Sequence, residues 1–148
     1  MALWEKIDQD LRAAMGAKNE IRLSTLRFLK SAIKYSAIEK KAQVLSDSEV
    51  RQVIQRQIKQ RRESIDQFEK GGRAQLAVRE KEELGILESY LPDQLSDKQL
   101  EEWVASEIRA AGAASKKDFG RMMKLLAEKL SGRAEPRRVS DILGRMLS

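Results

Sequence analysis

Apolar residues recur at helical spacing over almost the whole chain of 148 residues. Spacings of three and four residues place side chains on one face of an α-helix, whereas a half-buried strand needs alternation with a period of two. No run of four to eight residues alternates apolar and polar side chains between turn signals. This pattern restricts the chain to all-α folds. A composition rich in Ala, Leu, Glu, Lys, Arg and Gln, with only 2 prolines, agrees with it.

Seven helices are expected, because their ends coincide with residues that cap or stop helices. A Ser with Glu or Gln three residues later forms a capping box, and Gly readily adopts the left-handed conformation at a C-terminus. The first helix should begin near Leu3 and end at Gly16, and the second should run from about Asn19 to Glu39. The third should open at Ser46 with Glu49 and end at Gly71-Gly72, and the fourth should run from there to Pro92.

The last three helices form a separate group. The fifth helix should open at Ser96 with Gln99 and stop at Gly112, and the sixth should open at Ser115 with Asp118 and stop at Ser131-Gly132. The seventh should begin at Pro136, whose missing N–H costs nothing in a first turn. A boundary at residues 90–93 gives two helical domains, an N-terminal four-helix region over residues 1–92 and a compact C-terminal three-helix domain over residues 93–148. Trp103 and Phe119 are expected in the core of the second domain.

The chain contains no histidine and no cysteine. Histidine-based nucleophile systems, thiolate metal sites, iron–sulfur clusters and disulfides therefore cannot be built. The sequence also lacks the glycine-rich loops that cradle phosphates. We expect no catalytic residues, no metal site and no cofactor. With no apolar run of membrane-spanning length and no secretory pattern over residues 1–10, we also expect a cytoplasmic protein that does not contact membranes.

Basic residues are concentrated in two places, although the net charge is only +6. Residues 51–62 hold five basic side chains and no acidic one, residues 93–114 hold two basic and five acidic ones, and residues 115–148 hold nine basic and four acidic ones. One arc of the expected third helix, opposite a stripe of Val and Ile, carries Arg51, Arg56, Lys59 and Arg62. Such an arc fits a phosphate backbone; the alternative is an ordinary solvated face.

Arg61 lies on the apolar stripe of the same helix rather than on its basic arc. A guanidinium among isoleucines needs a carboxylate partner, and the candidates on the next helix are Glu80, Glu82 and Glu83. The alternative is an arginine that faces a ligand. A buried ion pair predicts that Arg61→Ala destabilises the fold far more than Arg62→Ala does.

The second basic cluster lies in the last two helices and the turn between them, and its members are Arg121, Lys124, Arg133, Arg137 and Arg138. Free N–H groups at a helix N-terminus bind anions, so the last three of these arginines predict a phosphate pocket at the start of the seventh helix. Helix capping with solvated arginines is the alternative.

The few aromatic residues fall mostly on apolar faces, and core packing is expected for Trp4, Phe28, Phe68, Trp103 and Phe119. Recognition of RNA would then rest on shape and phosphate contacts rather than on base stacking.

Several runs, taken in order, resemble a known family. Residues 59–64 (Lys-Gln-Arg-Arg-Glu-Ser), 68–73 (Phe-Glu-Lys-Gly-Gly-Arg) and the acidic run 80–88 before Tyr90-Leu91-Pro92 resemble the N-terminal half of YqeY-like (GatB/YqeY) proteins. Residues 118–123 (Asp-Phe-Gly-Arg-Met-Met) and 132–136 (Gly-Arg-Ala-Glu-Pro) resemble the C-terminal half. The resemblance covers essentially the whole chain.

That family is similar to the C-terminal helical and tail domains of the B subunit of the bacterial tRNA-dependent amidotransferase. The resemblance implies an association with carbon–nitrogen ligation that uses glutamine as the amide donor, but the catalytic domain of that enzyme has no counterpart here. Because its tail region contacts tRNA, the resemblance implies a non-catalytic RNA-binding module with tRNA as the expected partner. One alternative is an adaptor that docks on the amidotransferase or on another tRNA-handling enzyme. The other is an enzyme with a site among Glu80, Glu82, Glu83 and Tyr90.

Overall fold

The computed structural model describes residues 1–147 and contains helices but no strand in this range, which confirms the expected all-α fold class. The elements are α1 (Leu3–Ala17), α2 (Glu20–Glu39), α3 (Asp47–Lys70), α4 (Ala74–Glu88), α5 (Asp97–Ala111), the 3-10 helix η1 (Lys116–Asp118), α6 (Phe119–Lys129) and α7 (Pro136–Met146). The chain divides into two compact units, Met1–Leu91 and Pro92–Ser148.

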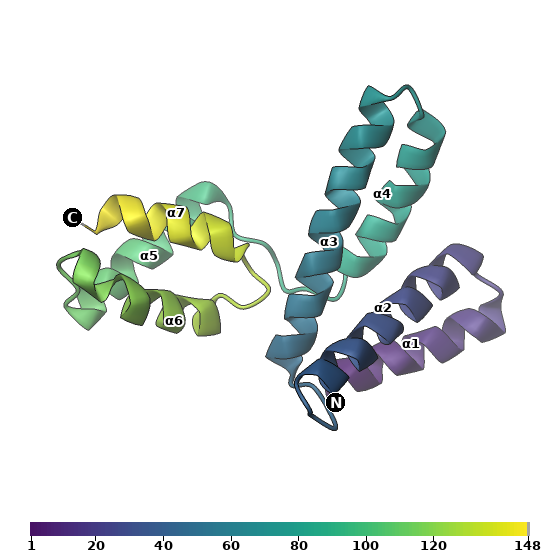
Figure 1. The fold of residues 1–148 in the computed structure, drawn as a ribbon, viewed down its shortest axis with the longest axis horizontal. Helices are drawn as coiled ribbons and strands as arrows, with labels where there is room; N and C mark the ends of the chain where they lie inside the picture. The colour runs from purple at the N-terminus through teal and green to yellow at the C-terminus, as the bar shows by residue number, and fades with distance from the viewer. Residues whose placement is uncertain (148) are drawn as a thin grey trace. The chain divides into compact units, whose positions relative to one another are not determined.

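The first unit consists of two antiparallel helical hairpins, α1 with α2 and α3 with α4 (Figure 1). Helix α2 contacts both α3 and α4, so it joins the hairpins into one structure. The apolar stripes that the sequence places on each helix meet in a common core, whose fully buried members include Ile7, Leu26, Leu29, Val50, Ile54 and Leu87.

The second unit is built from α5, α6 and α7 around its own core, in which Leu100, Val104, Met122, Leu126 and Leu143 are fully buried. Trp103 and Phe119, which were expected in the core, are half-buried and pack against the outside of this cluster. Pro136 occupies the first turn of α7, as expected.

Most helix ends follow the local signals, although α4 ends at Glu88 and does not reach Pro92 as expected. Two further exceptions concern α1 and α6. Both capping boxes form, at Ser46 with Glu49 and at Ser96 with Gln99. The predicted stop of α1 at Gly16 is wrong, because Gly16 remains helical and Lys18 adopts the left-handed conformation at φ 56°. Its N–H bonds to the carbonyls of Ala14 and Met15, which satisfies the last turn.

The second exception concerns the start of α6. Ser115 caps the short 3-10 helix η1 by accepting a hydrogen bond from the N–H of Lys117, and α6 itself begins at Phe119. The carboxylate of Asp118 instead accepts from the N–H of Ala114 at 3.1 Å. This hydrogen bond is the main reason why the pKa of Asp118 lies below its usual value.

Gln57 is a polar residue in the core of the first unit. Its side chain lies on the inward face of α3, where the residue is 5% exposed, and neither amide atom has a hydrogen-bond partner among the described residues. An unsatisfied buried polar group costs roughly 1–3 kcal/mol, and an apolar side chain of similar shape removes that cost.

Gln57→Met should therefore raise the free energy of unfolding by about 1 kcal/mol in urea titrations. Gln60→Met, an exposed change on the same helix, should stay within about 0.5 kcal/mol of the parent. A less stable Gln57→Met variant would show that the amide is satisfied in solution.

Tyr90 ties the end of α4 to α1. Its hydroxyl donates to Asp10 Oδ2 at 2.6 Å, and the residue is 8% exposed. Burial, followed by the hydrogen bond to Asp10, raises the pKa of the Tyr90 phenol well above its usual value. The folded state therefore holds this proton more tightly than the unfolded state, so its contribution to stability is complete below pH of about 10 and declines above it.

The decline attributable to Tyr90 should approach about 1.4 kcal/mol per pH unit once the unfolded phenol has ionised. Urea titrations between pH 8 and pH 11 should show the parent losing stability faster than Tyr90→Phe, which has no phenol proton to lose. Parallel pH profiles for the two proteins would contradict this account.

Candidate nucleic-acid interface

The basic arc on α3 faces away from the core of the first unit. Arg56, Lys59 and Arg62 are exposed and Arg51 is half-buried, while Val53, Ile54 and Ile58 on the opposite side are buried. Neither Arg56 nor Lys59 forms an ion pair with any residue in the range 1–147. These two side chains are separated by one helical turn, so both are available to neighbouring phosphates of a polyanion.

Arg61 behaves differently from this arc, as the helical pattern predicted. Its side chain is 13% exposed and pairs with Glu83, as well as with Glu80 at 3.2 Å. Glu83 also accepts from Arg79 Nε at 3.1 Å, and the guanidinium carbon of Arg61 lies 5.8 Å from the centre of the Phe28 ring. The predicted ion pair is confirmed, and Arg61 holds α3 against α4 rather than facing a ligand.

Two of the four residues considered for an enzyme site belong to the ion pairs of Arg61. Glu80 and Glu83 are engaged with Arg61, Glu82 is exposed, and Tyr90 is hydrogen-bonded to Asp10 of α1. Glu80 and Glu83 thus neutralise Arg61, and Tyr90 joins the end of α4 to α1. Within residues 1–147, no group of three or more Asp, Glu, His or Cys side chains could hold a metal ion.

On α6 the two candidate cations have different environments. Arg121 is exposed and pairs with Asp118 at 3.1 Å, three residues earlier. Lys124 is exposed and has no ion-pair partner in the described part of the chain. Lys124 is therefore the α6 cation whose charge is least compensated.

At the start of α7 the three arginines are not gathered around one point. Arg138 donates to the backbone carbonyl of Leu95 at 3.1 Å and to Asp97 at 2.6 Å. Arg133 is half-buried, with its guanidinium carbon 6.0 Å from the centre of the Trp103 ring. Arg137 alone is exposed without an ion pair to the residues that the structure describes.

A backbone contact explains why Arg138 is occupied. The N–H of Leu95 donates to the carbonyl of Arg133 at 2.9 Å, and the Gln94 amide donates to the carbonyl of Gly132. The segment before α5 is thereby fastened to the turn before α7, which brings Asp97 within reach of Arg138. The expectation that Arg138 helps to bind phosphate is not supported by this geometry, and Arg137 and Lys124 are the better candidates in the second unit.

The sequence reasoning missed an exposed apolar face on α2. Phe28, Tyr35 and Ile38 are 58%, 65% and 74% exposed, respectively. The expected core position of Phe28 is therefore wrong, and Trp4, at 37%, is exposed more than expected. The sequence contains a pattern that predicts this face. Phe28, Tyr35 and Ile38 are spaced by seven and three residues, which places them on one side of the helix, opposite the buried Leu26 and Leu29.

Comparison with known proteins gives a consistent result. A family model described as Yqey-like protein matches residues 4–147. The chain is 35% identical over 85 residues to "Altered inheritance of mitochondria protein 41, mitochondrial" of Lachancea thermotolerans, a match that covers 57% of this chain and 46% of that protein. The protein of the same name from Pyrenophora tritici-repentis is 28% identical, and the match covers 87% of this chain and 71% of that protein. The one from Saccharomyces cerevisiae is 29% identical, and the match covers 91% of this chain and 65% of that protein. The chain thus spans less than half of the first of these relatives.

The names of these relatives correct one expectation. They are called mitochondrial proteins, and this contradicts the cytoplasmic location inferred from the sequence. That inference excluded secretion and membrane insertion, and neither exclusion distinguishes the cytoplasm from the interior of an organelle. Among the described residues, no helix is both long and apolar enough to cross a membrane.

Proposed function

Because the chain belongs to the YqeY-like family, we propose that it is a non-catalytic helical module that binds RNA, with tRNA as its partner. The observation that carries the proposal is the exposed pair Arg56 and Lys59, which forms no ion pair with a carboxylate among residues 1–147 and lies on a helix whose opposite face packs in the core. Phosphate contacts from lysine and arginine supply most of the affinity of such complexes without reading sequence.

The second unit contributes Arg137 and Lys124 to this proposal. Both are exposed, and neither is neutralised by an ion pair with the described residues. The resemblance of this region to the tail domain of the amidotransferase B subunit supports the same assignment, since that domain contacts tRNA. An absence of exposed aromatic stacking residues along the basic arc favours recognition of RNA shape and backbone.

A second candidate function is an adaptor that docks on a tRNA-handling enzyme such as the amidotransferase. It is favoured by the exposed face of Phe28, Tyr35 and Ile38 on α2, because exposed aromatic and aliphatic side chains that share one face are typical of protein interfaces.

Filter binding of tRNA at several salt concentrations distinguishes the two functions. A complex dominated by phosphate contacts should weaken linearly on a plot of log K against log salt. Binding that is absent, or that is indifferent to salt, would contradict the RNA-binding function. A pull-down from cell extract that retains a protein partner after ribonuclease treatment would then support the adaptor.

A further inference from the structure

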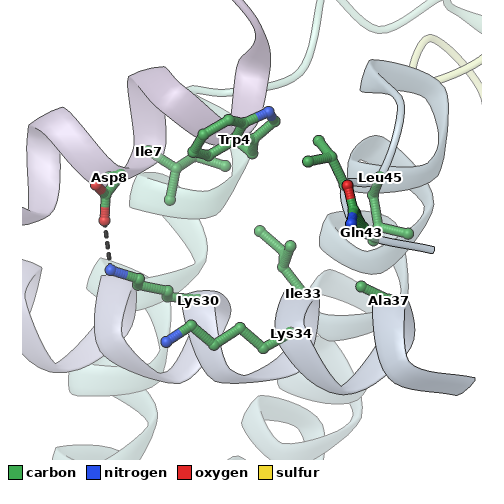
Figure 2. Close-up of a pocket in the computed structure, with 10 residues that line it drawn as sticks. Trp4, Ile7, Asp8, Lys30, Ile33, Lys34, Ala37, Gln43 and Leu45 are labelled. Atoms are coloured by element: carbon green, nitrogen blue, oxygen red, sulfur yellow. Dashed lines mark hydrogen bonds and ion pairs between the residues drawn. The ribbon is translucent and has the colours of Figure 1, made fainter. Parts of the chain in front are cut away.

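A mostly apolar pocket lies between α1, α2 and the segment that joins α2 to α3 (Figure 2). Its apolar walls are formed by Trp4, Ile7, Ile33, Ala37, Val44 and Leu45. Trp4 and Val44 are 37% and 53% exposed, so the pocket is accessible from solvent. The side chain of Ile33 points into the space below the Trp4 ring in Figure 2.

The size of the pocket restricts its ligand. Its volume is about 270 Å³. An apolar cavity of roughly 150 Å³ accommodates benzene, whereas sites for drug-sized ligands and cofactors occupy about 300–1,000 Å³. The pocket therefore suits a compact ring or a short acyl chain, and it is too small for a nucleotide cofactor.

The charges at the pocket wall restrict the ligand further. Asp8 is already neutralised, because Lys30 donates to its carboxylate and Arg12 lies 3.1 Å from its other oxygen. The hydrogen bond from Lys30 holds the pKa of Asp8 below its usual value, so Asp8 remains ionised and paired near neutral pH. Lys34 also lines the pocket and forms no ion pair with residues 1–147. Lys30 and Lys34 outnumber Asp8 among the charged residues that line the pocket, so the net charge of its wall is positive.

We propose that this pocket binds a small amphipathic carboxylate whose apolar part contacts Trp4 and Ile33 and whose carboxylate faces Lys34. Burial of the apolar part supplies the affinity, and Lys34 selects the acid over neutral or cationic analogues. The site is separate from the basic residues proposed to contact RNA, so it adds a small-molecule ligand to a protein otherwise expected to bind a macromolecule.

Two-dimensional NMR of the 15N-labelled full chain tests the proposal with three probes of equal chain length, octanoate, 1-octanol and octylamine. Octanoate should shift the indole N–H signal of Trp4 and leave that of Trp103, in the second unit, unchanged. It should bind about fivefold more tightly than 1-octanol, which corresponds to about 1 kcal/mol for a partly exposed charge pair, and octylamine should bind most weakly.

Substitutions locate the carboxylate. Lys34→Gln should remove the fivefold preference for octanoate and leave the binding of 1-octanol unchanged. Lys18→Gln removes the same charge at the far end of α1 and should have no effect. Ala37→Phe should fill the pocket and abolish binding of both probes, and Gln43→Glu, at an exposed wall position, should weaken octanoate alone.

Several results would overturn the proposal. These are a Trp4 signal that octanoate leaves unmoved, 1-octanol or octylamine binding as tightly as octanoate, or an octanoate preference that survives in both Lys34→Gln and Gln43→Glu.

Discussion

Replacing Arg61 with alanine should lower the free energy of unfolding by roughly 3–5 kcal/mol, the usual cost of removing one partner from a buried ion pair. Arg61 is the inward-facing partner of Glu83, a residue that is 7% exposed. The substitution would leave that carboxylate buried with Arg79 as its remaining partner, and the side chain of Arg79 is 59% exposed. It would also remove the cation above the Phe28 ring and a bridge to Glu80.

Arg62→Ala is the matched control, since it makes the same chemical change on the next residue of the same helix. Arg62 lies on the exposed face, where an ion pair contributes at most about 1 kcal/mol. Urea titrations should therefore separate the two variants by at least about 2 kcal/mol. Equal midpoints would mean that water reaches Glu83 and that the ion pair is a surface contact.

A double substitution distinguishes a buried charge from lost packing. Arg61→Met with Glu83→Leu removes both charges and retains apolar volume, so it should recover most of the stability lost in Arg61→Ala. If the double variant were as unstable as Arg61→Ala, the contribution of Arg61 would come from what methionine lacks, the cation over the Phe28 ring and the bridge to Glu80, and not from the neutralisation of Glu83.

The same residue illustrates how far sequence reasoning reaches. Helical periodicity places Arg61 on the inward face of α3, because the face on which a residue lies follows from its spacing to the other residues of the same helix. The choice among Glu80, Glu82 and Glu83 depends on the rotation of α4 against α3, and only the structure selects Glu80 and Glu83. Both capping boxes were predictable for the same reason as the face of Arg61, since each joins residues three positions apart.

Contacts between residues distant in the sequence account for the errors. Phe28 belongs to a helix with apolar residues on two sides, and its exposure depends on which side α3 and α4 cover. Arg138 meets Asp97 and Leu95 across more than 40 residues, through a loop contact with no signature in the sequence. The candidate RNA-binding cations could be enumerated from the sequence, but which of them remain uncompensated could not.

That distinction decides which substitutions test RNA binding. Arg138→Ala would disturb a contact between α7 and the start of α5, so a change in binding would have two explanations. Arg56→Ala with Lys59→Ala in the first unit, and Lys124→Ala with Arg137→Ala in the second, remove exposed cations that have no ion pair in the described chain and lie away from both cores.

A matched control removes the same formal charge from exposed lysines that already have partners. Lys6 is exposed and lies 3.9 Å from the half-buried Asp10, and Lys70 lies 2.9 Å from the exposed Asp66, each pair along one helix. Lys6→Ala with Lys70→Ala lowers the net charge of +6 by the same two units as either test variant. It should leave the salt dependence of tRNA binding close to that of the parent, because these lysines contact carboxylates rather than phosphates.

Each test variant should reduce the slope of log K against log salt by roughly 1.4–1.8, since one phosphate contact contributes about 0.7–0.9. At about 0.1 M salt this corresponds to binding roughly 25- to 60-fold weaker than that of the parent, and the loss should shrink as salt rises. A flattened slope in both test variants and an unchanged slope in the control would place both units on the RNA. A change in only one variant would restrict the interface to that unit. If the control lost as much as the test variants, net charge rather than these particular cations would govern the binding. If neither test variant changed the slope, these cations would not contact the RNA, and the exposed apolar face of α2 would become the better indication of what this protein recognises.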